Sequence, residues 1–299
     1  MHLRNTLITA IAPIAWGTTY IVTTELLPDG HPLFASLVRA LPAGLIAIAL
    51  TRQLPNGAWL WKSLVLGILN IGAFFPLLFI AAYRLPGGVA ATLGAAQPLI
   101  VAALMVVILR QNVPWRLVAW GIVGALGVAF VVLRASAQLD TAGVIAGLGG
   151  TASMAVGVIL SKRWGKPAGV SSLGYAGWLL TAGGLFLLPI TILGEGFPPT
   201  LDAPAIAGYA WLGIIGGVVA YTLWFRGIRI VPLTSIAVLG LLSPLTAAAL
   251  GALVLGERFS QLQLLGFALA LAAIVGAQIP SRADARARKR TPLSPDKVV

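Results

Sequence analysis

Residues 66–79 of this chain read LGILNIGAFFPLLF, and residues 212–225 read LGIIGGVVAYTLWF. The two stretches are identical at five of 14 positions without a gap, at a separation of 146 residues. The same separation pairs Gln97-Pro98 with Ser243-Pro244. This spacing predicts that the chain contains two copies of one structural unit.

The sequence on both sides of these stretches is apolar. Of the 299 residues, 59% are hydrophobic and 9% are charged, whereas about a quarter of the residues of a soluble domain are charged. A bilayer core about 30 Å thick is crossed by about 20 apolar residues in a helix. Charge-poor windows of this length predict ten transmembrane helices, at 6–24, 33–51, 60–82, 86–109, 115–133, 141–161, 173–193, 205–225, 231–255 and 261–279.

Ten helices in two copies give five helices per copy. Because five is odd, the second copy enters the membrane from the opposite face, and the two copies form an inverted repeat. We therefore predict an all-α membrane protein of ten transmembrane helices in two inverted five-helix repeats. The predicted units are 1–137 and 138–280, followed by a basic, disordered cytoplasmic tail at 281–299.

The basic residues predict the orientation of the chain. If the N-terminus is cytoplasmic, 16 of the 20 Lys and Arg residues lie on the cytoplasmic side and three on the other. By the positive-inside rule, both termini are expected in the cytoplasm, with the protein in a bacterial inner membrane. The cytoplasmic position of the basic residues thus explains the net charge of +12. Nucleic acid is therefore not an expected partner. The expected partners are the lipid bilayer and a small-molecule substrate.

Short motifs carry a resemblance to a known family. They are Trp16-Gly17-Thr18, Arg39, Tyr83-Arg84, Pro98, Gly227-Ile228-Arg229, Ser243-Pro244 and Leu255-Gly256-Glu257-Arg258. With these motifs, the chain resembles the ten-helix EamA-type branch of the drug/metabolite transporter superfamily over residues 1–280. It departs from the usual Gly-Glu-Arg ending of the first half by having Arg110-Gln111-Asn112. The resemblance implies export of amino acids or related metabolites.

Two prolines are expected to kink the fourth and ninth helices. Pro98 and Pro244 each lack an N–H and clash with the carbonyl four residues earlier, so the carbonyls of Gly94 and Gly240 should lose their helical partners. Without a side chain at these glycines, a ligand could approach the backbone closely. These four residues are the predicted hinge or kink positions. The alternative is that the kinks only shape helix packing.

Arg39 is the charged residue that lies well inside a predicted span. A charge at the bilayer centre costs about 2.5–3.5 kcal/mol even on insertion scales, so Arg39 is expected to face the bundle interior or a water-filled cavity. Snorkelling to the membrane surface and pairing with backbone groups are the alternatives.

Several aromatic and polar residues lie deep in the predicted helices. Trp16 and Tyr20 share a helix face, as do Asn70 and Phe74. Such a lining would suit an apolar or aromatic substrate with few polar groups, although packing in the core or against lipid is the alternative for each residue. The predicted substrate-binding set is Trp16, Thr19, Tyr20, Arg39, Asn70, Phe74, Phe79, Gln97, Trp178, Tyr221, Trp224 and Ser243.

Missing residue types exclude several functions. None of the predicted spans contains Asp or Glu at its middle, which disfavours proton-coupled export of cationic drugs. His2 and His31 lie outside the spans and the chain has no Cys, so neither a membrane protease dyad nor a metal site is expected. The phosphate-binding GxxxxGK[ST] motif is also absent. We therefore expect no enzyme activity, no cofactor and no metal.

The function predicted from the sequence is secondary transport. The chain should export small metabolites, above all aromatic or other hydrophobic amino acids, by alternating access around a cavity near the membrane midplane. A carrier for a drug, nucleoside or sugar derivative is the alternative in the same class, and a non-transporting membrane scaffold is the alternative from another class. Because the duplicated chain holds both halves of the site, a monomer should suffice.

Overall fold

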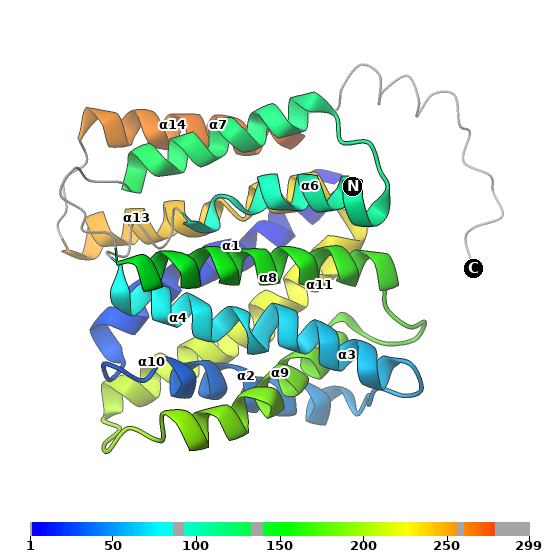
Figure 1. Cartoon of the computed structure of the whole chain (residues 1–299), viewed down its shortest axis with the longest axis vertical. Coiled ribbons are helices and arrows are strands. Elements are labelled where there is room, and N and C mark those ends of the chain that lie inside the picture. The colour runs from blue at the N-terminus through cyan, green and yellow to red at the C-terminus, as the bar shows by residue number, and fades with distance from the viewer. Residues whose placement is uncertain (1, 86–92, 133–139, 256–259, 279–299) are drawn as a thin grey trace.

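Figure 1 shows the computed structural model of the chain, which describes residues 2–85, 93–132, 140–255 and 260–278. The secondary structure of these residues is helical, and the predicted all-α class is confirmed. The Gly256-Glu257-Arg258 motif, the boundary between 137 and 138 and the predicted tail at 281–299 lie outside the described residues.

The helices of the first copy follow the predicted order. They are α1 (His2–Leu26), α2 (Pro32–Thr51), α3 (Trp59–Gly67), the π-helix η1 (Ile68–Gly72), α4 (Phe74–Arg84), α6 (Gln97–Leu109) and α7 (Trp115–Val132). The segments α3, η1 and α4 form one continuous apolar span, Trp59–Arg84.

The second copy repeats this order. Its helices are α8 (Thr141–Trp164), α9 (Ser172–Gly194), α10 (Ala203–Gly213), the π-helix η2 (Ile214–Val219), α11 (Ala220–Ile230), α12 (Leu233–Leu239), α13 (Leu242–Leu255) and α14 (Gln261–Gln278). Within the described ranges, six helices are long and apolar enough to cross a membrane, and four shorter apolar helices lie in α6, α7, α13 and α14. Together they account for the ten predicted spans.

Side-chain caps fix where the helices of the second copy begin. Asp140 accepts a hydrogen bond from the Gly143 N–H at 2.7 Å, and Ser171 and Asp202 cap α9 and α10 in the same way. Such caps satisfy backbone donors that have no partner within the helix. The start of α2 is capped across the bundle instead, because Glu195 accepts from the N–H groups of Leu33 and Phe34 at 2.9 and 2.7 Å.

The packing of the helices follows the symmetry of the two copies. By its order in the copy, α2 is equivalent to α9 and α7 to α14, and these two pairs make the most extensive helix contacts in the described structure. Further contacts come in matched pairs, since α4 packs on α8 as α11 packs on α1, and α6 packs on α8 as α13 packs on α1. Exchanging the two copies leaves this pattern unchanged, so the fold is two inverted five-helix repeats.

Small residues bring the equivalent helices close together. A methyl group at Gly184 of α9 would lie 2.7 Å from Leu41 Cβ of α2, and one at Gly127 of α7 would lie 2.8 Å from the Gly266 carbonyl oxygen of α14. Close backbone approach of this kind drives helix association in membranes, where apolar surface alone gives no preference for protein over lipid. In Figure 1, α7 and α14 lie side by side as a layer of their own above α6 and α13.

The fourth and ninth helices are broken rather than kinked. α12 ends at Leu239 and α13 begins at Leu242, while α6 begins at Gln97. Pro98 and Pro244 therefore stand in the first turn of α6 and α13, where a missing N–H costs no helical hydrogen bond. The predicted free carbonyl at Gly240 is wrong, because that oxygen accepts from the Ser243 N–H at 3.0 Å.

The repeated stretch that predicts the duplication also contains two π-helical segments. η1 begins at Ile68 and η2 at Ile214, which are separated by the repeat spacing of 146 residues. In η1 the Ala73 N–H donates to the Ile68 carbonyl at 2.7 Å, five residues earlier. Short π segments leave carbonyls of the same turn without their usual partners, so these segments offer the free carbonyls that the prolines were predicted to supply.

Candidate substrate cavity

A cavity lies where the two copies meet. It leaves about 90 Å³ open to the centres of water molecules, several times the room that one water needs. Both copies contribute to its wall, from α1, α2 and α4 in the first and α8 and α11 in the second, together with both broken helices. The lining residues are Trp16, Thr19, Tyr20, Arg39, Phe74, Leu78, Ala81, Gly94, Gln97, Gly147, Gly150, Thr151, Met154, Trp224, Gly240, Ser243 and Pro244.

Most of the residues predicted as a site meet at this cavity. Of the predicted substrate-binding set, eight line it: Trp16, Thr19, Tyr20, Arg39, Phe74, Gln97, Trp224 and Ser243. Three of the four predicted hinge residues, Gly94, Gly240 and Pro244, line it as well. Among the described lining residues Arg39 alone carries a charge, so the wall is apolar and aromatic with a few neutral polar groups.

Asn70 and Tyr221 lie outside the lining because they hold η1 in place. The Asn70 amide donates from Nδ2 to the Leu66 carbonyl at 2.9 Å and packs on Gly157 of α8. The Tyr221 hydroxyl donates to the Asn70 carbonyl at 3.3 Å. Both side chains are fully buried, and they satisfy backbone groups rather than face the cavity.

Phe79, Trp178 and Pro98 are also outside the lining. Phe79 is fully buried in the hydrophobic core. Trp178 donates from Nε1 to the Gln53 carbonyl at 2.7 Å and packs on Trp59 with 6.2 Å between ring centroids. Pro98 faces Gly121 of α7, where an added methyl would meet its Cβ at 3.5 Å. Phe79 therefore belongs to the core, and Trp178 and Pro98 make contacts between neighbouring segments of the bundle.

Sequence reasoning missed the contribution of α8 to the cavity. Gly147, Gly150, Thr151 and Met154 line it from one face of α8, and Leu78 and Ala81 line it from α4. Positions three and four apart share a helix face, so the run of small residues at 147, 150 and 151 was the available signal. This signal is weak, because small residues are also typical of plain helix packing.

Arg39 projects into the bundle at the cavity wall. Its side chain is 1% exposed, its Nη1 donates to Thr19 Oγ1 at 3.2 Å, and its guanidinium carbon lies 4.5 Å from the centre of the Phe75 ring. Nε has no hydrogen-bond partner among the described residues. The interior position predicted for Arg39 is thus observed, and snorkelling is not.

Trp16 and Tyr221 connect the two π segments. Trp16 donates from Nε1 to the Gly216 carbonyl of η2 at 2.9 Å, and Tyr221 donates to the Asn70 carbonyl of η1. Asn70 and Gly216 are equivalent at the repeat spacing of 146 residues. The Trp16 and Tyr221 rings are themselves in contact, with 4.9 Å between centroids. The carbonyls of equivalent turns therefore accept from two aromatic side chains that contact each other at a tilt of 53°.

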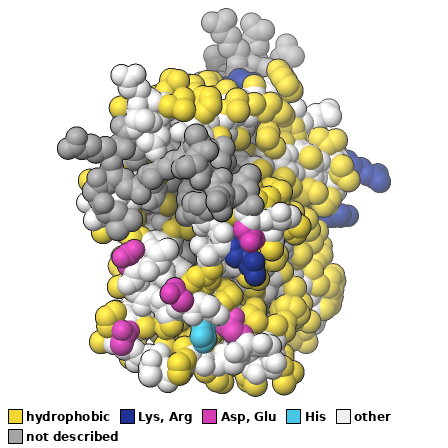
Figure 2. Space-filling view, turned by 60° about the vertical axis from the view of Figure 1, so that its left-hand side comes forward, with side chains coloured by type: hydrophobic (Ala, Val, Ile, Leu, Met, Phe, Trp, Pro, Cys, Tyr) yellow, Lys and Arg dark blue, Asp and Glu magenta, His cyan; other side chains and the backbone are white. Residues whose placement is uncertain are grey.

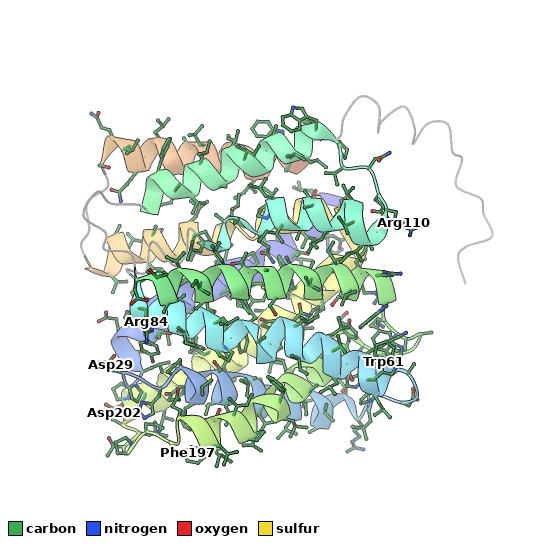
Figure 3. All side chains as sticks on the ribbon, in the orientation of Figure 1. Asp29, Trp61, Arg84, Arg110, Phe197 and Asp202 are labelled. Atoms are coloured by element: carbon green, nitrogen blue, oxygen red, sulfur yellow. The ribbon has the colours of Figure 1, made fainter. Side chains whose placement is uncertain are left out.

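The two ends of the bundle differ in charge. Asp29, Arg84 and Asp202 lie at one end and Trp61 and Arg110 at the other (Figure 3). Acidic side chains gather on the face that Figure 2 turns toward the viewer. We call the end that contains Asp29, Arg84 and Asp202 the acidic end, and the end that contains Trp61 and Arg110 the basic end.

The cavity lies toward the acidic end of the bundle. Its lining residues Ala81 and Gly147 are close in sequence to Arg84 and Asp140, which form an exposed ion pair at 3.4 Å. At the basic end, polar side chains form hydrogen bonds between helices. Lys162 donates from Nζ to the Ile228 carbonyl at 2.9 Å, and Arg226 donates to Asn5 Oδ1 at 3.2 Å.

Ten membrane helices in two inverted repeats, with a cavity between the repeats, form an architecture typical of membrane transporters. Comparison with known families identifies the particular kind of transporter. The chain matches the EamA-like transporter family twice, over residues 5–133 and 141–277, and it belongs to that family. The resemblance seen in the sequence motifs is therefore confirmed.

Individual relatives agree with this assignment. The chain is 45% identical over 264 residues to Protein PecM of Dickeya dadantii (strain 3937), covering 88% of this chain and 89% of PecM. It is 28% identical over 268 residues to the uncharacterized transporter YwfM of Bacillus subtilis (strain 168), covering 87% and 88%. It is 26% identical over 273 residues to the uncharacterized inner membrane transporter YedA of Escherichia coli (strain K12), covering 88% and 86%.

A solved crystal structure shares the fold. It superposes with a TM-score of 0.77 at 19% sequence identity, covering 97% of this chain and 100% of its own. The spans and the relatives together make this protein a transporter of the bacterial inner membrane rather than an enzyme.

Proposed function

We propose that this transporter exports small metabolites, above all aromatic or other hydrophobic amino acids, by alternating access around the cavity between its two repeats. The observation that carries the proposal is the composition of the wall, where Trp16, Phe74, Met154 and Trp224 face a small number of polar groups. Apolar walls with a few placed polar groups are typical of sites for small organic ligands.

Alternating access follows from the inverted repeat. Two equivalent copies can exchange conformations, which gives one state open to each side of the membrane around a shared site. Lys162 and Arg226 form hydrogen bonds between helices at the basic end, and the cavity lies toward the acidic end. With both termini in the cytoplasm, as the distribution of basic residues favours, this arrangement corresponds to a state closed to the cytoplasm.

One chain should be sufficient for transport. Both repeats supply lining residues, so the proposed site needs no second copy, and the bilayer and the solute are its proposed partners. The direction of transport is taken from the exporter branch that the sequence motifs resemble.

Filling the cavity tests the proposal. A methyl group at Gly94 would meet no atom of the described residues within 4 Å, and Gly94 lines the cavity, so Gly94→Leu should occupy the cavity without displacing the backbone. Counterflow of labelled phenylalanine in proteoliposomes of the purified protein should be abolished in Gly94→Leu. Gly194→Leu is the matched control, because Gly194 ends α9 away from the cavity and its added Cβ would make an ordinary contact of 3.8 Å with Leu33.

The same assay separates the competing substrates. Unlabelled leucine and tryptophan should compete with labelled phenylalanine, whereas a nucleoside or a sugar should not. Competition by a nucleoside or sugar alone would replace the amino acid proposal, and the absence of flux for every solute would favour a scaffold.

A further inference from the structure

We infer that Arg39 is the carboxylate-binding residue of the cavity, so that the transported solute must carry a carboxylate, while its ammonium group is dispensable. This inference rests on the proposed function and names the chemical group that the site recognises. It comes from a buried cation that the described part of the protein leaves without an anionic partner.

The charge of Arg39 is not neutralised by the residues around it. Among the described residues its one hydrogen bond goes to a neutral hydroxyl, Thr19 Oγ1, and the one ion pair joins Arg84 to Asp140 elsewhere. The sequence places all eight Asp and Glu residues outside the ten predicted spans. An arginine at this depth normally pairs with an anion or with carbonyls, because an unpaired buried charge is costly.

The guanidinium is nevertheless held in a defined position. Phe75 lies under it at 4.5 Å, and Thr19 accepts from Nη1. A methyl group at Gly216 would come within 3.2 Å of Nη2, so the glycine of η2 leaves room for that nitrogen. A ring and a hydroxyl interact with a cation more weakly than a carboxylate does, and among the described residues only Nη1 of the guanidinium has a hydrogen-bond acceptor.

Arg39 lines the cavity, so a carboxylate bound in the cavity would lie beside its guanidinium group. Its planar fork of donors matches the two oxygens of a carboxylate. A phosphate ester would bring close to two negative charges, and the described lining offers no second cation to pair with them. The single positive charge therefore favours a monoanionic carboxylate.

The remaining wall has no charged group for an ammonium. Gln97, Thr151 and Ser243 are the neutral polar side chains that line the cavity beside Thr19 and Tyr20. They can accept a hydrogen bond from an ammonium but cannot neutralise it. An amino acid should thus be held mainly through its carboxylate and its apolar side chain.

Three ligands that share one ring distinguish these contributions. Tryptophan carries both charges, indole-3-propionate lacks the ammonium, and tryptamine lacks the carboxylate. Ligand-induced thermal stabilisation of the purified full chain should rank indole-3-propionate within a few-fold of tryptophan in apparent affinity. Tryptamine should bind at least about 10-fold more weakly, since it forfeits a charge-assisted hydrogen bond.

Variants of the arginine should remove this discrimination. Arg39→Gln should weaken binding of the two carboxylates by about 10- to 100-fold and leave tryptamine unchanged or improved. Thr19→Val, which keeps the charge and removes its hydrogen-bond acceptor, should weaken the carboxylates by a smaller factor. Arg84→Gln is the control, because it removes an arginine whose side chain is 53% exposed in an ion pair outside the cavity, and it should preserve the ranking.

The outcomes separate the two proposals. If tryptamine binds the parental protein as tightly as indole-3-propionate does, the carboxylate inference is overturned while aromatic transport stands. If the aromatic ligands fail, leucine, 4-methylpentanoate and 3-methylbutylamine repeat the comparison with an aliphatic side chain. Failure of all six ligands overturns both proposals. The comparison on the parental protein needs no variant, so poor folding of Arg39→Gln would leave the test intact.

Discussion

At the residue scale, side chains of α1 form hydrogen bonds with a backbone carbonyl and an indole N–H of the helix that carries η2. Trp16 donates to the Gly216 carbonyl at 2.9 Å, and Thr18 accepts from Trp211 Nε1 at 2.8 Å. Gly17 between them lets α1 touch α13, because a methyl group there would lie 2.6 Å from the Ser243 carbonyl oxygen. Three consecutive residues thus join three helices, which explains why this tripeptide stands out as a motif.

Replacing Trp16 by phenylalanine tests the bond to η2. The variant keeps an aromatic ring beside Tyr221 and Trp224 but leaves the Gly216 carbonyl without its donor, which should cost about 1–3 kcal/mol of stability. We expect a lower melting temperature of the purified protein and a slower transport rate. The control is Trp211→Phe, because Trp211 is 44% exposed and its loss should matter less. Equal effects of the two substitutions would show that the buried carbonyl is not the cause.

At the element scale, irregular helices surround the cavity. The span α3–η1–α4 and its equivalent α10–η2–α11 contain π segments, and the fourth and ninth helices are broken. Irregular backbone inside a membrane is tolerated where protein or a cavity covers it. Here Ser153 donates to the Leu69 carbonyl at 2.8 Å, and aromatic side chains cover the carbonyls of Asn70 and Gly216.

The prolines at the two breaks should control the transport rate more than folding. A proline in the first turn of a helix costs little, but alanine at the same position would allow the two helical pieces to join. Joining them should shift the balance between the two end states. We expect Pro98→Ala and Pro244→Ala to change the initial transport rate in proteoliposomes while the melting temperature changes little. Their effects need not be equal.

Pro42→Ala is the control for these substitutions. Pro42 lies inside α2 and is exposed at the surface of the bundle, away from the cavity. Its replacement should leave the rate near the parental value. Parental rates for both Pro98→Ala and Pro244→Ala would refute a role of the breaks in the conformational change.

At the scale of the whole molecule, charge and cavity are both asymmetric along the helix direction. Acidic residues gather at the end toward which the cavity lies, and Lys162 and Arg226 form hydrogen bonds between helices at the other end. The positive-inside rule favours a basic end that faces the cytoplasm. In that orientation, a reagent added outside the cell should reach the loops of the acidic end and not those of the basic end.

Cysteine labelling can measure this orientation directly. The chain has no Cys, so a thiol reagent reports only the residue introduced. Asn56 and Thr200 are exposed in loops at opposite ends of the bundle. A membrane-impermeant maleimide should label Thr200→Cys in intact cells and Asn56→Cys only after the membrane is opened. The reverse pattern would invert the proposed topology.

Much of the site was predictable where a residue type is unusual for a membrane helix. Arg39 and the prolines stand out against an apolar background, and Trp16, Tyr20 and Phe74 lie at the correct depth. Thr151 and the glycines of α8 did not stand out, because small residues are common in membrane helices. Asn70 and Tyr221 have equally unusual side chains, yet they bond to backbone carbonyls and miss the cavity.

The sequence by itself determined the ten helices, their division into two copies and the inverted relation of those copies, because hydropathy, repeat spacing and an odd helix number are properties of the linear chain. Only the tertiary structure decided where the backbone departs from the α-helix and which side chains reach the freed carbonyls. A π segment at Ile68 or Ile214 is stable when a donor from another helix meets its carbonyls, as Tyr221 and Trp16 do. These hydrogen bonds depend on how the helices cross. The crossing is set by contacts between residues that are far apart in the sequence, such as Trp16 and Gly216.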